Sequence, residues 1–280
     1  MGRGLIVNCS TGRFRVQAAI PFIRDEGSGP AVLCLHSNAS TSSQWRALAG
    51  RLAHRHRVIA VDGYGAGKSP EWPDDRGLRL ADEVVLAASA IALAGERFDL
   101  VGHSYGAAVA VKLALMHPAR VRSLILYEPT LFHLVAGAHP LSSPAAGVWH
   151  AAGDAAEAVA RGDNFAAAER FIDFWMGSGS WAAMPAARQP AVAASMRNVQ
   201  GWRDVTFADN LGLDELRALE MPVLLMWGQL SPESATSVVR ALQDAFPNAT
   251  LAPQPGLGHM GPITHAERIN AQIAEFIARS

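Results

Sequence analysis

Short apolar runs alternate with helical patterns through the first 130 residues, and this alternation limits the folds open to the chain. The predicted strands are PAVLCLH (30–36), RVIAVDG (57–63), FDLVGHS (98–104) and VRSLILYEP (121–129). The predicted helices are 44–56, 79–95 and 105–118. Strands alternating with helices are typical of a parallel sheet, and continuous apolar strands are typical of burial on both faces. The sequence therefore predicts an α/β protein with helices on both faces of a central parallel sheet.

The alternation stops after Pro129 and resumes near residue 213. The stretch between has no run typical of a strand and is rich in alanine, with scattered aromatics at Trp149, Phe165, Phe171, Phe174, Trp175, Trp181, Trp202 and Phe207. The elements predicted after it are a strand over 221–228, a helix over about 232–246, a strand over 248–256 and a helix over about 263–279. We predict one main domain, 1–130 and 213–280, interrupted by a mainly helical insertion, 131–212.

The pentapeptide GHSYG (102–106) matches G-x-S-x-G between a predicted strand and a predicted helix. In this context the motif is a sharp turn that lifts the hydroxyl of Ser104 out of the sheet. The chain crowds itself at such a turn, so glycine is needed on either side of the serine. The helix that follows directs its N–H groups and its positive dipole end toward the hydroxyl. Ser104 is therefore a candidate nucleophile.

With these features the chain resembles the α/β-hydrolase fold superfamily over nearly its full length. The motifs in family order are LHSN (35–38), QWR (44–46), VDGYGAGKS (61–69), GHSYG (102–106) and GLGHM (256–260). The resemblance implies a mostly parallel central sheet with helices on both faces and a helical cap formed by the insertion. It implies a serine nucleophile, but it leaves the substrate open because this fold carries many chemistries.

A serine attacks well only when a base removes its proton, and the sequence offers ten histidines. His259 lies in the glycine-flanked loop PGLGHMGP between the last predicted strand and the last predicted helix. The resemblance assigns the base to this position. His103 adjoins Ser104, but adjacent strand residues point to opposite sides, so we predict a structural role for it. His36 is expected to organise the loop that binds the oxyanion.

The acid of the triad departs from the usual pattern. Many relatives carry an aspartate three residues after the glycine that ends the preceding strand, and here that position is Ser231. A serine cannot stabilise an imidazolium as a carboxylate does. Glu128 ends the predicted strand beside the one that carries Ser104, and some branches of the superfamily take their acid from this place. We predict Glu128 as the acid, with Glu233 as the alternative.

An oxyanion hole needs two donors directed at the developing charge. The resemblance assigns them to the backbone N–H groups of Tyr105 and Asn38. Relatives usually carry glycine after the histidine of the first loop, whereas this chain has Ser37. The Asn38 amide could instead contact a substrate, and an ordinary turn residue is the further alternative.

Composition excludes several classes of protein. Lys and Arg number 24 against 25 Asp and Glu, a net charge of −1, which argues against a nucleic-acid partner. The sequence has no run of about 18 apolar residues and no secretory leader at its start, so we expect no membrane association and no export. Cys9 and Cys34 are its two cysteines, and we expect a cytoplasmic protein with a buried free thiol at Cys34. A homodimer stays open.

No cofactor or metal is expected. The run GYGAGKS (63–69) resembles a phosphate-binding loop, but Asp62 stands where that motif requires glycine. No histidine and carboxylate spacing typical of a metal site occurs.

The sequence thus predicts a serine hydrolase that cleaves a small, mostly apolar carboxylic ester or related acyl substrate through an acyl-enzyme on Ser104. His259 is the base and Glu128 the acid. The first alternative is a carbon–carbon bond hydrolase of ring-cleavage products, which uses the same machinery. The second is a non-catalytic ligand-binding protein on the same scaffold. Dehalogenase and epoxide hydrolase activities are disfavoured because the resemblance gives both an aspartate nucleophile.

Overall fold

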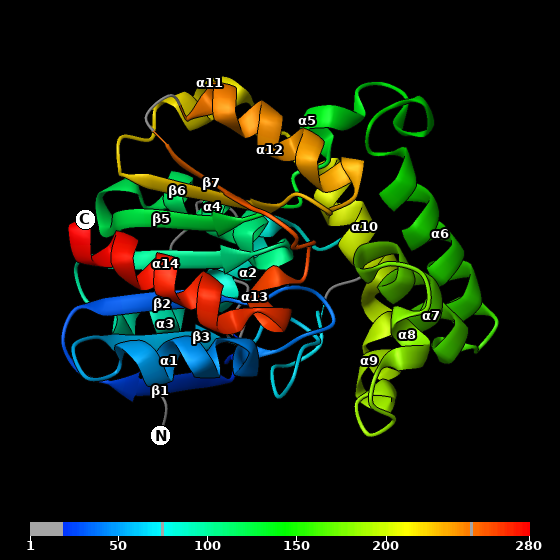
Figure 1. The fold of residues 1–280 in the computed structure, drawn as a ribbon, viewed down its shortest axis with the longest axis horizontal. Helices are drawn as coiled ribbons and strands as arrows, with labels where there is room; N and C mark the ends of the chain where they lie inside the picture. The colour runs from blue at the N-terminus through cyan, green and yellow to red at the C-terminus, as the bar shows by residue number, and fades with distance from the viewer. Residues whose placement is uncertain (1–18, 74–75, 247–248) are drawn as a thin grey trace, which may run out of the picture.

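A twisted sheet forms the centre of the molecule (Figure 1). The computed structural model describes residues 19–280 except 74–75 and 247–248. Within these residues the strand order is β1-β3-β2-β4-β5-β6-β7; β1 runs antiparallel to β3, and the other neighbours are parallel. The strands are β1 (Ile23–Gly27), β2 (Ala31–Leu35), β3 (Arg57–Val61), β4 (Phe98–His103), β5 (Val121–Tyr127), β6 (Val223–Gly228) and β7 (Thr250–Gln254). The predicted fold class is confirmed.

Helices cover both faces of the sheet. One face carries α2 (Leu80–Leu86), α3 (Ala88–Leu93), α4 (Tyr105–Met116), α11 (Leu213–Arg217) and α12 (Glu233–Ala245). The other carries α1 (Arg46–Leu52) and α14 (Ala266–Arg279), with α13 (Gly261–Thr264) before α14 (Figure 1). Successive strand side chains point to opposite faces, so Leu33 and Ile59 join the first core while Val32 and Val58 join the second. Both faces are therefore apolar, as the continuous strand runs predict.

The remaining described elements are short 3₁₀ turns and the helices of residues 131–212. The 3₁₀ turns are η1 (Ser42–Trp45), η2 (Pro118–Arg120), η3 (Pro140–Ser142) and η4 (Met196–Asn198). The helices are α5 (His133–Ala136), α6 (Ala146–Ala160), α7 (Asn164–Met176), α8 (Ser180–Ala183), α9 (Gln189–Ser195) and α10 (Val199–Ala208). Helices α6 to α10 stand together at one end of the sheet, beyond the carboxyl ends of the parallel strands (Figure 1).

Three elements differ from the sequence prediction. Strand β1 was not predicted because its sequence, IRDEG, has no apolar run; it is an edge strand paired with β3 alone, and its side chains are half-buried or exposed. The helix predicted over 79–95 is two helices, α2 and α3, that meet at Ala87. The last predicted helix divides at His265 into α13 and α14. Alanine favours helix on both sides of the first break, so composition carries no signal for it.

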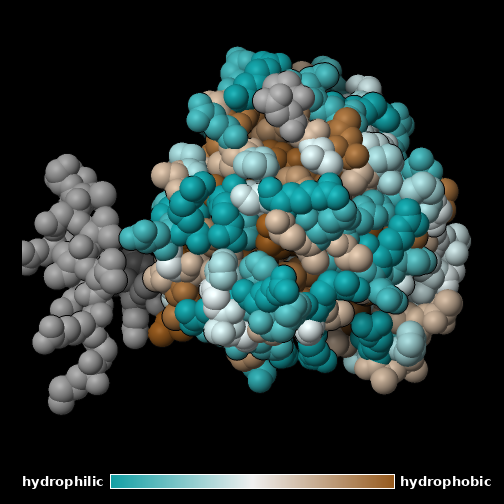
Figure 2. All heavy atoms as spheres, turned by 60° about the vertical axis from the view of Figure 1, so that its left-hand side comes forward, coloured by the Kyte–Doolittle hydropathy of each residue, from teal (hydrophilic) through white to brown (hydrophobic). Residues whose placement is uncertain are grey.

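The surface is largely polar on the face shown in Figure 2, where hydrophobic residues are scattered among hydrophilic ones. Among the described helices, none has both the length and the apolar character needed to cross a membrane. Cys34 is a free, fully buried thiol in β2, and burial raises its pKa above the ordinary value. Cys9 lies outside the described residues.

Candidate active site

Ser104 occupies a strained turn between β4 and α4. Its φ is 57° and its ψ −118°, a conformation that a residue with a side chain adopts only when its surroundings hold it there. A Cβ on Gly102 would lie 2.5 Å from the Cα of Ala107, and one on Gly106 would lie 2.4 Å from the carbonyl oxygen of Leu35. The two glycines of the motif are therefore required by close packing of the turn, and the turn directs the serine hydroxyl away from the sheet.

A continuous hydrogen-bond chain joins Ser104, His259 and Glu128. The Ser104 Oγ lies 2.8 Å from His259 Nε2, and His259 Nδ1 lies 2.5 Å from Glu128 Oε2. A carboxylate oxygen only accepts, so Nδ1 carries the imidazole proton and Nε2 accepts from the serine hydroxyl. The three residues are 4%, 2% and 0% exposed, so bulk water does not compete for these hydrogen bonds. This is the arrangement in which an imidazole can take a proton from a serine.

Glu128, which directly follows β5, is held by Gly228 at the end of β6 and by Ser231 in the loop after it. Its φ is 46°, so it occupies a second strained position beside that of Ser104. Its Oε1 accepts hydrogen bonds from the Gly228 N–H at 2.6 Å and from the Ser231 hydroxyl at 2.5 Å. Ser231, which stands where relatives usually carry aspartate, thus donates to the carboxylate from the loop that follows β6. One oxygen of the carboxylate is fixed by these two donors, and the other accepts the hydrogen bond from His259 Nδ1.

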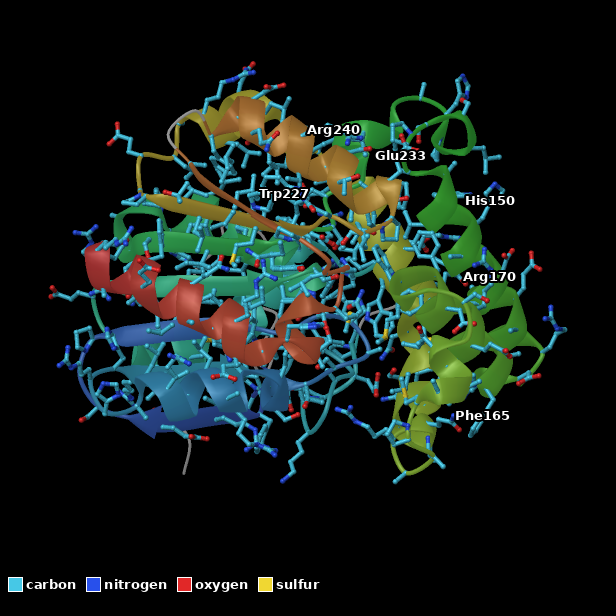
Figure 3. The ribbon with its side chains drawn as sticks, in the orientation of Figure 1. His150, Phe165, Arg170, Trp227, Glu233 and Arg240 are labelled. Atoms are coloured by element: carbon cyan, nitrogen blue, oxygen red, sulfur yellow. The ribbon has the colours of Figure 1, made fainter. Side chains whose placement is uncertain are left out.

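Glu233, the alternative acid, lies elsewhere. It begins α12, its side chain is exposed, and Figure 3 labels it at the start of that helix. The structure brings Glu128 to His259, and it does not bring Glu233 there.

The two predicted oxyanion donors come from separate loops. Tyr105 is the first residue of α4, where N–H groups have no acceptor within the helix. Asn38 follows β2 and lines the same cavity as Ser104 and His259. His36 braces this loop, because its Nδ1 donates to the Ser37 carbonyl at 2.7 Å and its Nε2 accepts from the Gly63 N–H at 3.1 Å. Burial lowers the pKa of His36, which favours the neutral imidazole that these two contacts require.

A cavity of about 150 Å³ opens above Ser104. Most of its lining is apolar and comes from residues 131–212. These apolar lining residues are Phe132, Val148, Phe171, Ile172, Trp175, Met176, Val192, Val199, Trp202 and Phe207. Its polar wall includes Ser37, Asn38, Ser104 and His259, and Arg188 and Arg203 add charge. A substrate bound here would place an apolar group under the helices and a polar group against the serine.

The aromatic residues singled out in the helical segment divide into two groups. Phe171, Trp175, Trp202 and Phe207 line the cavity. Trp149, Phe165, Phe174 and Trp181 do not, and Phe165 is 50% exposed and points outward in Figure 3. The sequence does not distinguish the two groups, because both consist of Trp and Phe residues within the helical segment.

Trp175 makes the most direct contact between the helical segment and the triad. Its ring stacks on the His259 imidazole, with centroids 4.0 Å apart and planes at 27°. The indole therefore covers one face of the imidazole. The sequence carried no signal for this contact, since the two residues are far apart in the chain.

Buried Glu83 contacts Tyr105, one of the two predicted oxyanion donors. Its Oε1 accepts from the Tyr105 hydroxyl at 3.1 Å and its Oε2 from the Tyr64 N–H at 3.2 Å. Burial outweighs these hydrogen bonds and raises the pKa of Glu83 from the ordinary 4.5 to about 7. Between these two pH values the folded chain holds a proton that the unfolded chain has lost. Stability from this group is therefore greatest below pH 4.5 and falls as the pH rises through 7.

We expect the Glu83→Gln variant to be more stable than the wild type at pH 8, because glutamine resembles the protonated acid. The gain in unfolding free energy should approach about 3 kcal/mol at pH 8 and fall below about 1 kcal/mol at pH 5. Urea denaturation at the two pH values measures both differences. Glu96→Gln, an exposed change, should alter neither. A Glu83→Gln variant no more stable than the wild type at pH 8 would contradict this assignment.

Within the described residues, no group of three or more His, Cys, Asp or Glu side chains is arranged to hold a metal ion.

A serine turn after the central strand of an open sheet, with the histidine beyond the last strand, is the arrangement that defines α/β hydrolases as a class. The chain belongs to the alpha/beta hydrolase family, whose sequence profile matches residues 32–272.

Relatives that match most of the chain include hydrolases. The chain is 28% identical to 2-hydroxymuconate semialdehyde hydrolase of Pseudomonas sp. (strain CF600), an alignment covering 94% of this chain and 88% of that one. It is 27% identical to pimeloyl-[acyl-carrier protein] methyl ester esterase of Aeromonas hydrophila, covering 90% and 96%. The fold resembles that of the enol-lactonase of Burkholderia xenovorans LB400 (TM-score 0.74, 19% identity, 92% and 96% covered). The protein is therefore an α/β-hydrolase enzyme.

Proposed function

We propose that the protein is a serine hydrolase that cleaves carboxylic esters through an acyl-enzyme on Ser104. The observation that carries this proposal is the unbroken chain from Ser104 Oγ through His259 to Glu128, at 2.8 Å and 2.5 Å, on the floor of an apolar cavity. His259 takes the serine proton as Oγ attacks the ester carbonyl carbon, and Glu128 orients the imidazole and balances its charge. The full set of site residues is Ser104, His259, Glu128, Tyr105 and Asn38.

The attack forms a tetrahedral intermediate whose carbonyl oxygen carries negative charge. The backbone N–H groups of Tyr105 and Asn38 donate to that oxygen, and the dipole of α4 adds to their effect. His259 then passes its proton to the departing alcohol, which leaves Ser104 acylated. Water activated by His259 attacks the acyl-enzyme by the same route in reverse and releases the acid.

We also propose that residues 131–212 act as a cap over a main domain made of 1–130 and 213–280. The cavity lining and the Trp175 ring on His259 support this role. A cap of this kind excludes water from the acyl-enzyme and selects substrates by the shape of its apolar wall. The substrate is accordingly small and mostly apolar next to the carbonyl.

Carbon–carbon bond hydrolysis of a ring-cleavage product is the second candidate. It is favoured by the 28% identity to 2-hydroxymuconate semialdehyde hydrolase over 94% of the chain. Both reactions need the same activated serine, so the site geometry does not separate them.

The wild-type enzyme should hydrolyse p-nitrophenyl acetate, butyrate or octanoate with saturable kinetics, and a fluorophosphonate should inactivate it with a single adduct on Ser104. Initial rates over the three acyl lengths, and peptide mass analysis of the adduct, measure these outcomes. Turnover of a vinylogous diketone ring-cleavage product with poor ester turnover would favour the second candidate. A folded protein with neither turnover nor adduct would contradict both.

A further inference from the structure

Two loops bring the reactive groups of the site together, and each comes from a different part of the chain. The loop after β2 carries Ser37 and Asn38, and the loop after β7 carries His259. Neither reactive residue lies in a helix or a strand, so side-chain contacts between the loops bear on their spacing.

Gln44 and His103 connect these two loops through side-chain hydrogen bonds, and we call this connection the bridge. The Gln44 side chain accepts at Oε1 from the Ser37 N–H at 3.1 Å and from the Ser37 hydroxyl at 3.0 Å. Its Nε2 lies 3.0 Å from Nδ1 of His103, and Nε2 of His103 lies 2.8 Å from the carbonyl oxygen of His259. His103 is 0% and Ser37 2% exposed, and Gln44 between them is half-buried.

The His259 carbonyl at one end of the bridge determines which atom donates and which accepts in each of its hydrogen bonds. The His259 carbonyl only accepts, so His103 carries its proton on Nε2 and accepts at Nδ1. Gln44 must therefore donate with its amide nitrogen, which leaves Oε1 to accept from Ser37. Burial lowers the pKa of His103 well below the ordinary value, which keeps the ring neutral and the direction unchanged.

The bridge acts on the backbone of the reactive loops. Ser37 immediately precedes Asn38, the proposed oxyanion donor, and the bonded carbonyl belongs to His259, the proposed base. Tyr127 supports the loop that carries His259, because its hydroxyl donates to the Gly258 carbonyl at 2.8 Å. Its ring also packs edge-on against His103, with ring centroids 5.5 Å apart.

We propose that Gln44 and His103 are positioning residues that set the spacing between the oxyanion loop and the base; this inference rests on the proposed function. Neither side chain lines the cavity above Ser104. If the bridge is broken, the two loops can shift independently. The Asn38 N–H and the His259 imidazole are then no longer held at the correct distance from each other around the substrate carbonyl. Displacements of about 1 Å in such sites lower rates about 100-fold.

The test compares Gln44→Met, His103→Leu and the double variant, with Gln254→Met as the matched control. Gln254 is a buried glutamine whose side chain makes hydrogen bonds to Ala252 and Gln272, whereas Gln44 is half-buried; Gln254 lies outside the bridge. Fluorophosphonate titration counts the active serines, so that kcat is expressed per competent site and loss of folded protein is removed from the comparison. Ester kcat and KM are measured for each variant.

We expect each single change to lower kcat per titrated serine about 10- to 100-fold, with KM within about threefold. The double variant should be no slower than the slower single variant, because both remove one bridge. Gln254→Met should keep the wild-type kcat. A Gln44→Met kcat within twofold of the wild type, or single effects that multiply in the double variant, would overturn the proposal.

A measurement without turnover separates this proposal from the proposed function. Nitrogen NMR of histidine-labelled wild-type protein should show His103 as a single Nε2–H tautomer at neutral pH, and Gln44→Met should alter its Nδ1 resonance. An Nδ1–H tautomer would overturn the bridge whatever the activity. Absence of both ester turnover and a Ser104 adduct in the wild type would instead count against the proposed function.

Discussion

Replacement of Ser104 by alanine is expected to lower kcat for an ester substrate by about 10⁶-fold. Alanine removes the hydroxyl oxygen that lies 2.8 Å from His259 Nε2, so no acyl-enzyme can form on residue 104. The oxyanion donors and the cavity remain, and they should leave a small rate above that of the uncatalysed reaction. Binding of a substrate-like ester or its product acid should change little, because the serine contributes mainly to the transition state.

Stopped assays with high enzyme concentration measure the residual rate, and the fluorophosphonate adduct should disappear. Ser237→Ala is the matched control, since Ser237 is also buried but donates to the Glu233 carbonyl in α12, away from the cavity. That variant should keep the wild-type kcat. A Ser104→Ala enzyme that retains more than about one hundredth of kcat would show that hydrolysis does not pass through Ser104.

Replacement of Glu128 by glutamine is expected to lower kcat about 10⁴-fold, as removal of the charge does in other triads. Glutamine is close to glutamate in size and can still accept from Gly228 and Ser231. It carries no charge, however, so it neither stabilises the imidazolium nor holds the proton on Nδ1 of His259. The variant therefore tests charge and tautomer control with little change in packing.

Ester kcat and the rate of fluorophosphonate inactivation should fall together in Glu128→Gln, because both depend on the same activated serine. Glu233→Gln is the matched control: Glu233 is exposed at the start of α12 and should be replaceable within about twofold. The reverse pattern, with Glu233→Gln inactive and Glu128→Gln near the wild type, would identify Glu233 as the acid and contradict the assignment of Glu128.

Much of the fold follows from local patterns. The apolar runs at 30–36, 57–63, 98–104 and 121–129 predict strands because a strand buried on both faces must be apolar at every position. Strand β1 has no such run, since an edge strand with half-exposed side chains needs none. The break at Ala87 was not predicted, because alanine favours helix on both sides of it. The division at His265 was not predicted either.

The chemistry of the site divides along the same line. The GHSYG turn is a local structure, so its context alone indicates where a strained serine lies. The hydrogen bond from Ser231 to Glu128 is not local, because the two residues are far apart in the chain. The pairing of β5 with β6 brings the hydroxyl to the carboxylate. Ser231, which in the sequence takes the place of the usual aspartate, donates a hydrogen bond in the fold to Glu128, the proposed acid.

The sequence by itself determined the strand and helix alternation, the place of the helical segment and the turn that carries Ser104, because each depends on residues close together in the chain. Tertiary structure alone decided that Glu128 meets His259, that Trp175 stacks on it, and that Gln44 and His103 join the two loops. Hydrogen bonds and ring contacts depend on distances of a few ångströms between side chains. Those distances exist only after the sheet has placed residues more than 50 positions apart beside one another.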